Sequence, residues 1–300
     1  MDTAAVGTKL KGIMTALVTP LDKNGNVDET KLRDLVSRQI KAGIHGFLVL
    51  GGTGEYCALS RAERVRAVES TVNESKGRVV VIAGVLDPGI GDSIESGLAF
   101  KKAGADALLT LVPYYVHPTQ EGIHDFFMRV CDAINMPIMI YNIPYRTMVN
   151  CLPETVERLV DDDKRIVGIK QCNTNLAESI DLVRRAGDRI ALFSGEDFLF
   201  PSQFMIGMKN AMIASTNLIP DLWMDIYDKL VSGKYEEAFK LHKELYPLIK
   251  AIYAETNPGP MKWGMNKIGL PGGELSIPLV EPSAATKENL LAAMKNWKLV

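Results

Sequence analysis

Lys170 is the residue whose position most clearly suggests chemistry. It closes the run 166–170, in which every other residue is apolar or glycine. A buried, unpaired ammonium is costly, and desolvation favours the neutral amine that attacks carbonyl groups. The position therefore suits a lysine that forms an imine with a carbonyl substrate. The alternative is a lysine whose tip reaches solvent or pairs with Glu55 or Asp197.

Other residues at the ends of apolar runs could bind a 2-oxo acid. Run 47–50 is followed by GGTGE, where Gly52 and Thr53 offer close backbone approach, N–H groups and a hydroxyl to a carboxylate. An ordinary tight turn is the alternative, and the sequence matches no nucleotide-phosphate loop pattern. Run 138–142 contains Tyr141, a possible proton shuttle, and Arg146 follows it, a possible carboxylate partner. Taken one at a time, these residues are better interpreted as packing or surface residues. Their combination with Lys170 favours a catalytic site.

Eight short apolar runs must position these residues. Each is rich in Val, Ile or Leu, and helix-length amphipathic segments such as 28–42, 60–74, 120–134 and 175–186 lie between them. Near-continuous apolar runs are typical of parallel strands that are buried on both faces. The pattern predicts a (β/α)₈ TIM barrel, with an open doubly wound sheet as the alternative. The runs are residues 13–18, 47–50, 79–83, 107–112, 138–142, 166–170, 190–194 and 211–215.

The periodicity changes after the eighth run. From residue 222 onward only helical periodicity is found, with breaks at Gly233, at 257–260 and at 270–273. We expect residues 1–221 to form the barrel that carries the active site. Residues 222–300 should form a C-terminal helical extension.

Composition argues against several classes of partner. A formal net charge of −2 gives no field that would attract nucleic acid or anionic lipid, and no run is long and apolar enough to span a membrane. The N-terminus does not resemble a secretory signal, and four widely spaced cysteines suggest reduced thiols, so we expect a cytoplasmic protein. Four histidines form no close-spaced ligand pattern, so we expect no metal.

Seven segments together resemble the dihydrodipicolinate synthase/N-acetylneuraminate lyase family of class I aldolase-type barrels, over nearly the whole chain. Their combination in this order is specific, although no single segment is. They are GIMTALVTPLDKNGNVD (12–28), GGTGE (51–55), VPYYVHPTQEG (112–122), YNIPYRT (141–147), GIK (168–170), FSGED (193–197) and NPGPMK (257–262).

The resemblance implies a role for each matching position in the active site. Lys170 matches the Schiff-base lysine and Tyr141 the tyrosine that moves protons at the imine. Thr53, with the amides of its loop, matches the site for the 2-oxo-acid carboxylate. Arg146 matches the arginine that orients the second substrate, and Ile213 matches a residue whose backbone carbonyl faces the active site.

The resemblance also implies assembly. Tyr115 matches a tyrosine that reaches a neighbouring subunit's active site, and Tyr114 matches its interface neighbour. Such enzymes are commonly homotetramers, built as dimers of dimers, and they need no metal or organic cofactor.

Three departures from the family pattern leave the reaction open. Synthases carry Thr or Ser at the position of Gly52, where the hydroxyl links the two relay tyrosines. Met148 replaces a usual glycine, and Gln171 and Cys172 follow the lysine.

The first hypothesis is condensation of pyruvate with an aldehyde, in particular aspartate semialdehyde, as in lysine biosynthesis. The second keeps the imine but performs aldol cleavage or dehydration of a 2-oxo-3-deoxy sugar acid, or deamination of a cyclic imino acid. The third is a non-catalytic barrel that binds a 2-oxo acid, against which the pair Tyr141 and Lys170 argues.

Overall fold

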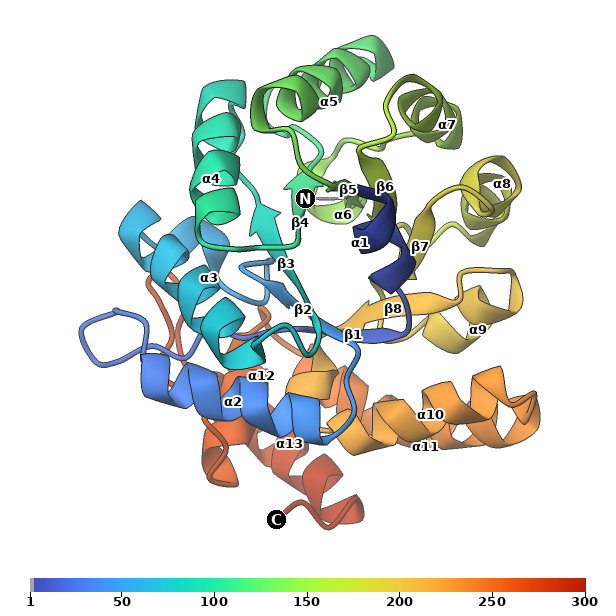
Figure 1. Ribbon diagram of the computed structural model, residues 1–300. Helices are drawn as coiled ribbons and strands as arrows, with labels where there is room; N and C mark the ends of the chain where they lie inside the picture. The colour runs from blue at the N-terminus through green and yellow to red at the C-terminus, as the bar shows by residue number, and fades with distance from the viewer. Residues whose placement is uncertain (1–2) are drawn as a thin grey trace.

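The computed structural model describes residues 3–300 and contains a closed barrel of eight parallel strands. Each strand pairs with the next, and β8 closes the ring by pairing with β1, as the end-on view in Figure 1 shows. The structure thus confirms the (β/α)₈ TIM barrel and excludes the open sheet. The strands are β1 (Ile13–Ala16), β2 (Gly46–Val49), β3 (Val80–Val85), β4 (Ala107–Leu111), β5 (Ile138–Asn142), β6 (Ile166–Gln171), β7 (Ala191–Ser194) and β8 (Asn210–Ile213).

The predicted apolar runs form these strands, and nearly every residue of the strands is buried in the barrel. Six strands are buried throughout, and β7 and β8 are buried except at their first residue. The ends of all eight strands differ from the predicted runs by at most two residues. Helices cover the outer face of each strand and side chains of the barrel interior cover its inner face, so neither face is exposed to solvent. The ends of the strands therefore become the places where polar side chains gather.

Helices surround the barrel, and several begin at side chains that cap their first turn. Asp28, Ser60, Thr119 and Asn175 each accept a hydrogen bond from a backbone N–H of the helix that follows. The helices are α2 (Glu29–Lys41), α3 (Arg61–Ser75), α4 (Ile90–Lys102), α5 (Gln120–Ile134), α6 (Pro144–Thr147), α7 (Pro153–Asp162), α8 (Leu176–Ala186), α9 (Phe200–Met205) and α10 (Pro220–Val231), with 3₁₀ turns η1 (Tyr56–Ala58) and η2 (Ser215–Asn217).

The segment after β8 is helical, as expected. It contains α10, α11 (Tyr235–Ile252), α12 (Gly259–Lys267) and α13 (Ala284–Asn296), and no named strand follows β8 in the described chain. Gly233 and residues 257–258 and 270–273 lie between these helices. The expected boundary after residue 221 falls inside α10, which contacts β1 and α9 as well as α11. The division into two domains therefore remains a prediction.

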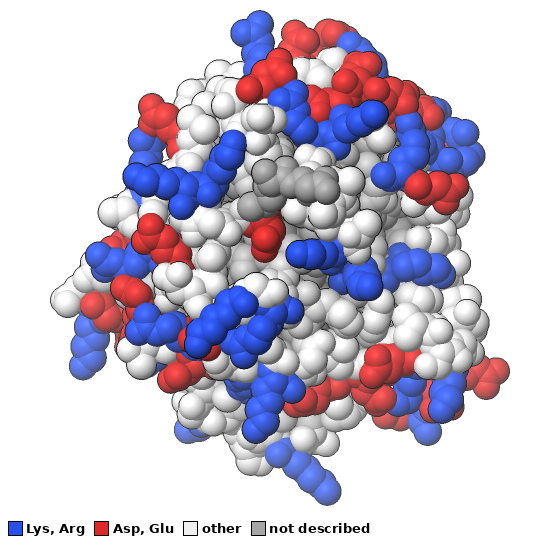
Figure 2. Space-filling view, viewed as in Figure 1, with Lys and Arg blue, Asp and Glu red and all other residues white. Residues whose placement is uncertain are grey.

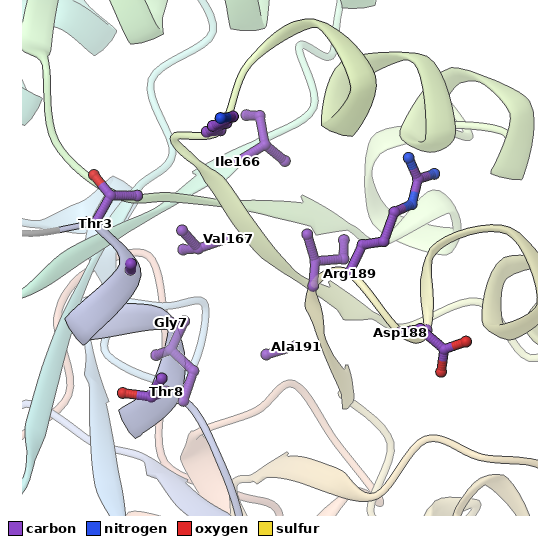
Figure 3. A pocket seen from close by; sticks show the side chains of 13 residues that line it. Thr3, Gly7, Thr8, Ile166, Val167, Asp188, Arg189 and Ala191 are labelled. Carbon is purple, nitrogen blue, oxygen red and sulfur yellow. The ribbon is translucent and has the colours of Figure 1, made fainter.

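A short helix that the sequence analysis did not predict covers the end of the barrel where the strands begin. This helix, α1 (Thr3–Lys9), lies across the barrel opening in Figure 1 and contacts β6. Between it and the first residues of β6 and β7 is a cavity of about 770 Å³, with Gly7, Ile166 and Ala191 on its wall (Figure 3). This cavity is larger than the two at the other end of the barrel, but catalytic residues of such barrels lie at that other end.

Surface charge on the face seen from α1 is mixed. Figure 2 shows basic and acidic side chains interspersed around this face rather than gathered by sign. In the described residues, no helix is both long and apolar enough to cross a membrane.

Candidate active site

A cavity of about 260 Å³ lies where the strands end, and it brings together five of the predicted site residues. Gly52, Thr53, Tyr141, Arg146 and Lys170 all line it. The rest of the wall comes from neighbouring strand ends and from the segment before α12: Ile143, Tyr145, Cys172, Gly195, Met212, Ala214, Tyr253, Glu255, Thr256 and Asn257.

Lys170 lies near the end of β6, directly beside Tyr141 of β5. The two residues are paired in the register of the strands, and the Lys170 Nζ is 4.8 Å from the centroid of the Tyr141 ring. Lys170 is only 6% exposed. In the part of the chain that the structure describes, its ammonium makes no hydrogen bond and no ion pair.

Glu55 and Asp197, the two possible ion-pair partners of Lys170, interact with other groups. Glu55 pairs with Lys262, at 2.6 Å between Oε1 and Nζ. Asp197 accepts hydrogen bonds from the backbone N–H groups of Ala214 and Ser215. Lys170 is therefore buried without Glu55 or Asp197 as an ion-pair partner, and a desolvated lysine of this kind suits imine formation.

Gly195 makes room for the lysine. A Cβ at this position would lie 2.9 Å from Cε of Lys170 and 2.1 Å from Sγ of Cys172, so any larger residue would displace both. The glycine of FSGED is thus explained by close packing against the side chain of Lys170.

Tyr141 keeps its proton. Burial, with a smaller contribution from the Cys172 thiol, raises the pKa of Tyr141 well above its ordinary value. A neutral phenol beside the lysine can donate a hydrogen bond to a substrate oxygen and take part in proton transfer there.

The loop after β2 presents the Thr53 hydroxyl to the cavity. Asn257 Nδ2 donates to Thr53 Oγ1 at 2.9 Å, so the hydroxyl proton of Thr53 is free to donate to a ligand. The remaining amide oxygen of Asn257, Oδ1, is buried without a hydrogen-bond partner in the described chain.

Gly52 is not required by the backbone. Its φ is not positive, and a Cβ built there would have no heavy atom within 4 Å. A positive φ therefore does not demand glycine at this position. The open space belongs to the cavity.

Arg146 lies on α6 and lines a second cavity as well. This adjoining cavity measures about 510 Å³ and shares Gly52, Tyr141 and Arg146 with the first. Met148, which ends α6, takes the left-handed conformation at φ 56°. The residue type departs from the family, but the conformation is one that favours glycine.

Two predicted residues do not line the cavity. Tyr115 is 86% exposed, whereas Tyr114 lies on the wall of the adjoining cavity. A role for Tyr115 in a neighbouring subunit stays a prediction. The carbonyl oxygen of Ile213 accepts a hydrogen bond from Thr216 Oγ1 at 2.6 Å, and Met212 and Ala214 form the wall at this strand end. The structure thus does not place Ile213 on the cavity wall.

Sequence reasoning missed a polar group behind the lysine. Burial, and then the charge of Asp197, raise the pKa of Glu196 to about 7. Tyr145 and Cys172 lie beside its carboxyl group. The signal was present, because Glu196 follows the end of β7 in the FSGED segment. Asn257 likewise lies in the NPGPMK segment, which predicted no separate role for it.

No cofactor or metal ligands are evident in the cavity. Within residues 3–300, the one group of three or more His, Cys, Asp or Glu residues that could hold an ion is Glu121, His124 and Asp125, and none of these lines the cavity. The expectation that the reaction needs neither metal nor cofactor remains a prediction.

Known proteins resemble this chain over nearly its full length. The sequence pattern of the dihydrodipicolinate synthetase family matches residues 9–297. A 4-hydroxy-tetrahydrodipicolinate synthase of Geotalea uraniireducens is 39% identical over 290 residues, which cover 97% of this chain and 99% of the relative.

Solved structures agree with this assignment. A dihydrodipicolinate synthase of Thermotoga maritima is 32% identical in sequence and superposes with a TM-score of 0.94. The match covers 97% of this chain and 100% of that structure's chain. A structure described as a monomeric dihydrodipicolinate synthase variant is also 32% identical, with a TM-score of 0.94 and coverage of 98% and 99%. The chain belongs to the dihydrodipicolinate synthetase family and is a lyase-type enzyme.

Proposed function

We propose that this enzyme condenses pyruvate with aspartate semialdehyde, as a 4-hydroxy-tetrahydrodipicolinate synthase of lysine biosynthesis does. The observation that carries the proposal is the buried, unpaired Lys170 beside Tyr141 in a cavity at the ends of the strands. The names of the full-length relatives support the choice of substrates.

Lys170 would begin the reaction as a nucleophile. Its neutral amine attacks C2 of pyruvate, and loss of one water from the carbinolamine gives an imine. The Tyr141 hydroxyl, which lies beside the lysine, donates a proton to the departing oxygen and later accepts one. Loss of a proton from the pyruvate methyl group then gives the enamine.

Thr53 would hold the pyruvate carboxylate. Because its oxygen already accepts a hydrogen bond from Asn257, the Thr53 hydroxyl is oriented to donate to the carboxylate. In the GGTGE loop the backbone N–H groups of Gly54 and Glu55 already donate to carbonyl groups of the loop, so those of Gly52 and Thr53 would assist the hydroxyl. This arrangement would hold C2 of pyruvate next to the lysine.

Arg146 would bind the carboxylate of the second substrate. It lines both cavities, so its guanidinium can contact a molecule that extends from the cavity of Lys170 into the adjoining one. The enamine carbon attacks the aldehyde carbon and forms the new C–C bond. The amino group of the semialdehyde then attacks the imine carbon, which closes the ring and releases the lysine amine.

Gly52 supports a second candidate function. The space beside it is open, where the hydroxyl of a synthase threonine would link two tyrosines. That space could instead accept part of a 2-oxo-3-deoxy sugar acid, whose cleavage or dehydration uses the same imine. A water molecule that bridges the tyrosine hydroxyls would preserve the synthase relay.

Exposed apolar residues support assembly into a homotetramer. Tyr115 and Val116 are 86% and 74% exposed, and a loop of this kind is normally covered by a partner. Leu176 and Ile180 form a second exposed pair on α8, so two separate contacts are available for a dimer of dimers. The monomeric relative shows that this fold does not require assembly. Sedimentation that finds a fully active monomer at micromolar concentration would refute this part.

We retain the cytoplasm as the proposed location, since the four cysteines are all free thiols in the structure.

The test of the proposed reaction compares substrates in the wild type and in Gly52→Thr. If the enzyme is a synthase, the wild type forms product from pyruvate and aspartate semialdehyde, and the variant keeps or exceeds that rate. If the space belongs to a sugar acid, the wild type is nearly inert with aspartate semialdehyde, and the variant loses the cleavage or dehydration activity. A wild type that forms the pyruvate imine but ignores aspartate semialdehyde would overturn the synthase proposal.

A further inference from the structure

Two helices on the outside of the barrel are joined by a polar seam far from the proposed reaction. Glu121 of α5 accepts hydrogen bonds from both terminal nitrogens of Arg158 of α7, at 2.6 and 2.7 Å. One turn along each helix, His124 Nε2 lies 2.8 Å from Asp162 Oδ2. The two helices are neighbours in Figure 1.

His124 carries an unused nitrogen at this seam. A carboxylate can only accept, so Asp162 places the proton of the neutral ring on Nε2 and leaves a lone pair on Nδ1. The residue is 8% exposed, and Nδ1 is buried with no hydrogen-bond partner in the described chain. A buried nitrogen without a partner is costly and calls for an explanation.

Two carboxylates lie around this nitrogen. Asp125 Oδ1 is 3.9 Å from Nδ1, too far for a hydrogen bond. One ligand atom from each of Glu121, His124 and Asp125 can be chosen so that all lie within 4.8 Å of one another. Zinc lies about 2.0–2.2 Å from imidazole nitrogen or carboxylate oxygen. The 3.9 Å between Nδ1 of His124 and Oδ1 of Asp125 is less than twice that bond length, so one ion could contact both atoms. An oxygen of Glu121 lies within 4.8 Å of a ring nitrogen of His124 and an oxygen of Asp125.

We propose that Glu121, His124 and Asp125 form a binding site for a divalent transition-metal ion, with zinc as the preferred ion. Imidazole together with carboxylate suits zinc, whereas magnesium and calcium prefer oxygen ligands alone. Asp162 supplies the carboxylate that orients a zinc-bound histidine from its other nitrogen.

The ion would stabilise the packing of α5 against α7. Its ligands come from α5, and the carboxylate that orients His124 is the last residue of α7. Arg158 can stay in place, because each oxygen of Glu121 has a second lone pair for the metal. None of the three ligands lines the catalytic cavity, so the site is structural and independent of the proposed reaction.

Zinc binding to the full-length protein tests the proposal. The protein is first freed of metal with a chelator and then titrated with zinc by calorimetry, with a thermal melt at each end point. We expect one zinc per chain and a higher melting temperature with zinc. Magnesium at the same concentration should produce neither effect.

Substitutions locate the ion. Asp125 makes no hydrogen bond within the described chain and its side chain is 64% exposed, so Asp125→Asn should fold normally yet bind zinc at least about tenfold more weakly. His124→Gln should abolish binding. Asp132→Asn removes the same charge from the same helix, two turns away, and should bind zinc as the wild type does.

Two results would overturn the proposal. One is an absence of zinc binding by the wild type at millimolar concentration. The other is binding that persists in both Asp125→Asn and His124→Gln, which would place the ion elsewhere, for example on the exposed thiol of Cys57. Turnover should not depend on zinc, so a failure here leaves the proposed function untouched.

Discussion

Replacing Glu196 by glutamine should stabilise the protein at pH 8 by much more than at pH 5. The carboxyl group lies next to Lys170, Cys172 and Tyr145 at the end of β7, and burial followed by the charge of Asp197 raises its pKa to about 7. Glutamine has nearly the same shape but cannot ionise. The substitution therefore removes the cost of a charge without removing the side chain.

The sign and size follow from the two pKa values of Glu196. A carboxyl whose folded pKa is above its unfolded pKa holds its proton more tightly in the folded state, so stability falls as pH rises between the two. The rise from an ordinary pKa of 4.5 to about 7 lowers the free energy of unfolding by about 3 kcal/mol at high pH. At pH 5 the unfolded carboxyl is already largely ionised, which leaves about 2–3 kcal/mol of the effect between pH 5 and pH 8.

Denaturant unfolding at both pH values, at one protein concentration, measures this effect. The stability of Glu196→Gln minus that of the wild type is compared between pH 8 and pH 5, so that packing changes common to both cancel. Glu69→Gln on the exposed face of α3 serves as the control and should show no pH-dependent gain. An equal difference at pH 5 and pH 8 for Glu196→Gln would refute the assignment of a proton-binding carboxyl behind Lys170.

Three further substitutions test other parts of the account. Tyr141→Phe should slow turnover by about 10²–10⁴-fold in steady-state kinetics with little change in melting temperature, and a rate within about threefold of the wild type would require another proton route. Gly52→Thr should melt within about 1 °C of the wild type, since its Cβ meets open space at an ordinary φ; a fall of several degrees would contradict the open space. Met148→Gly should stabilise the protein by about 1 kcal/mol in denaturant unfolding, because φ 56° strains any residue with a Cβ and the side chain is 72% exposed. Unchanged or lower stability would show that the Met148 side chain contributes packing that outweighs the strain.

The strands and the core of the site could be predicted because burial leaves a clear signal. An apolar run that ends in a lysine or tyrosine marks the end of a barrel strand, and the cyclic order of parallel strands brings consecutive ends together. Tyr141 and Lys170 are neighbours for this reason, since β5 and β6 are adjacent and their ends align.

Other features depend on contacts that no local pattern contains. Asn257 reaches Thr53 across 204 positions of the chain, so its place in the site follows from the folding of the C-terminal segment over the barrel. The raised pKa of Glu196 arises from its burial and from the charge of Asp197. The proposed role of Tyr115 depends on a second chain. Helix α1 has only one buried residue, Val6, and so lacks the periodic apolar pattern by which longer helices are found.

The most direct test of the central claim is reduction with borohydride in the presence of pyruvate, followed by peptide mapping. We expect inactivation that depends on pyruvate and one stable adduct on Lys170, which is buried beside Tyr141. Lys170→Arg should give no adduct, because a guanidinium cannot act as the nucleophile. An adduct on Lys262 alone, or none that depends on pyruvate, would contradict the claim.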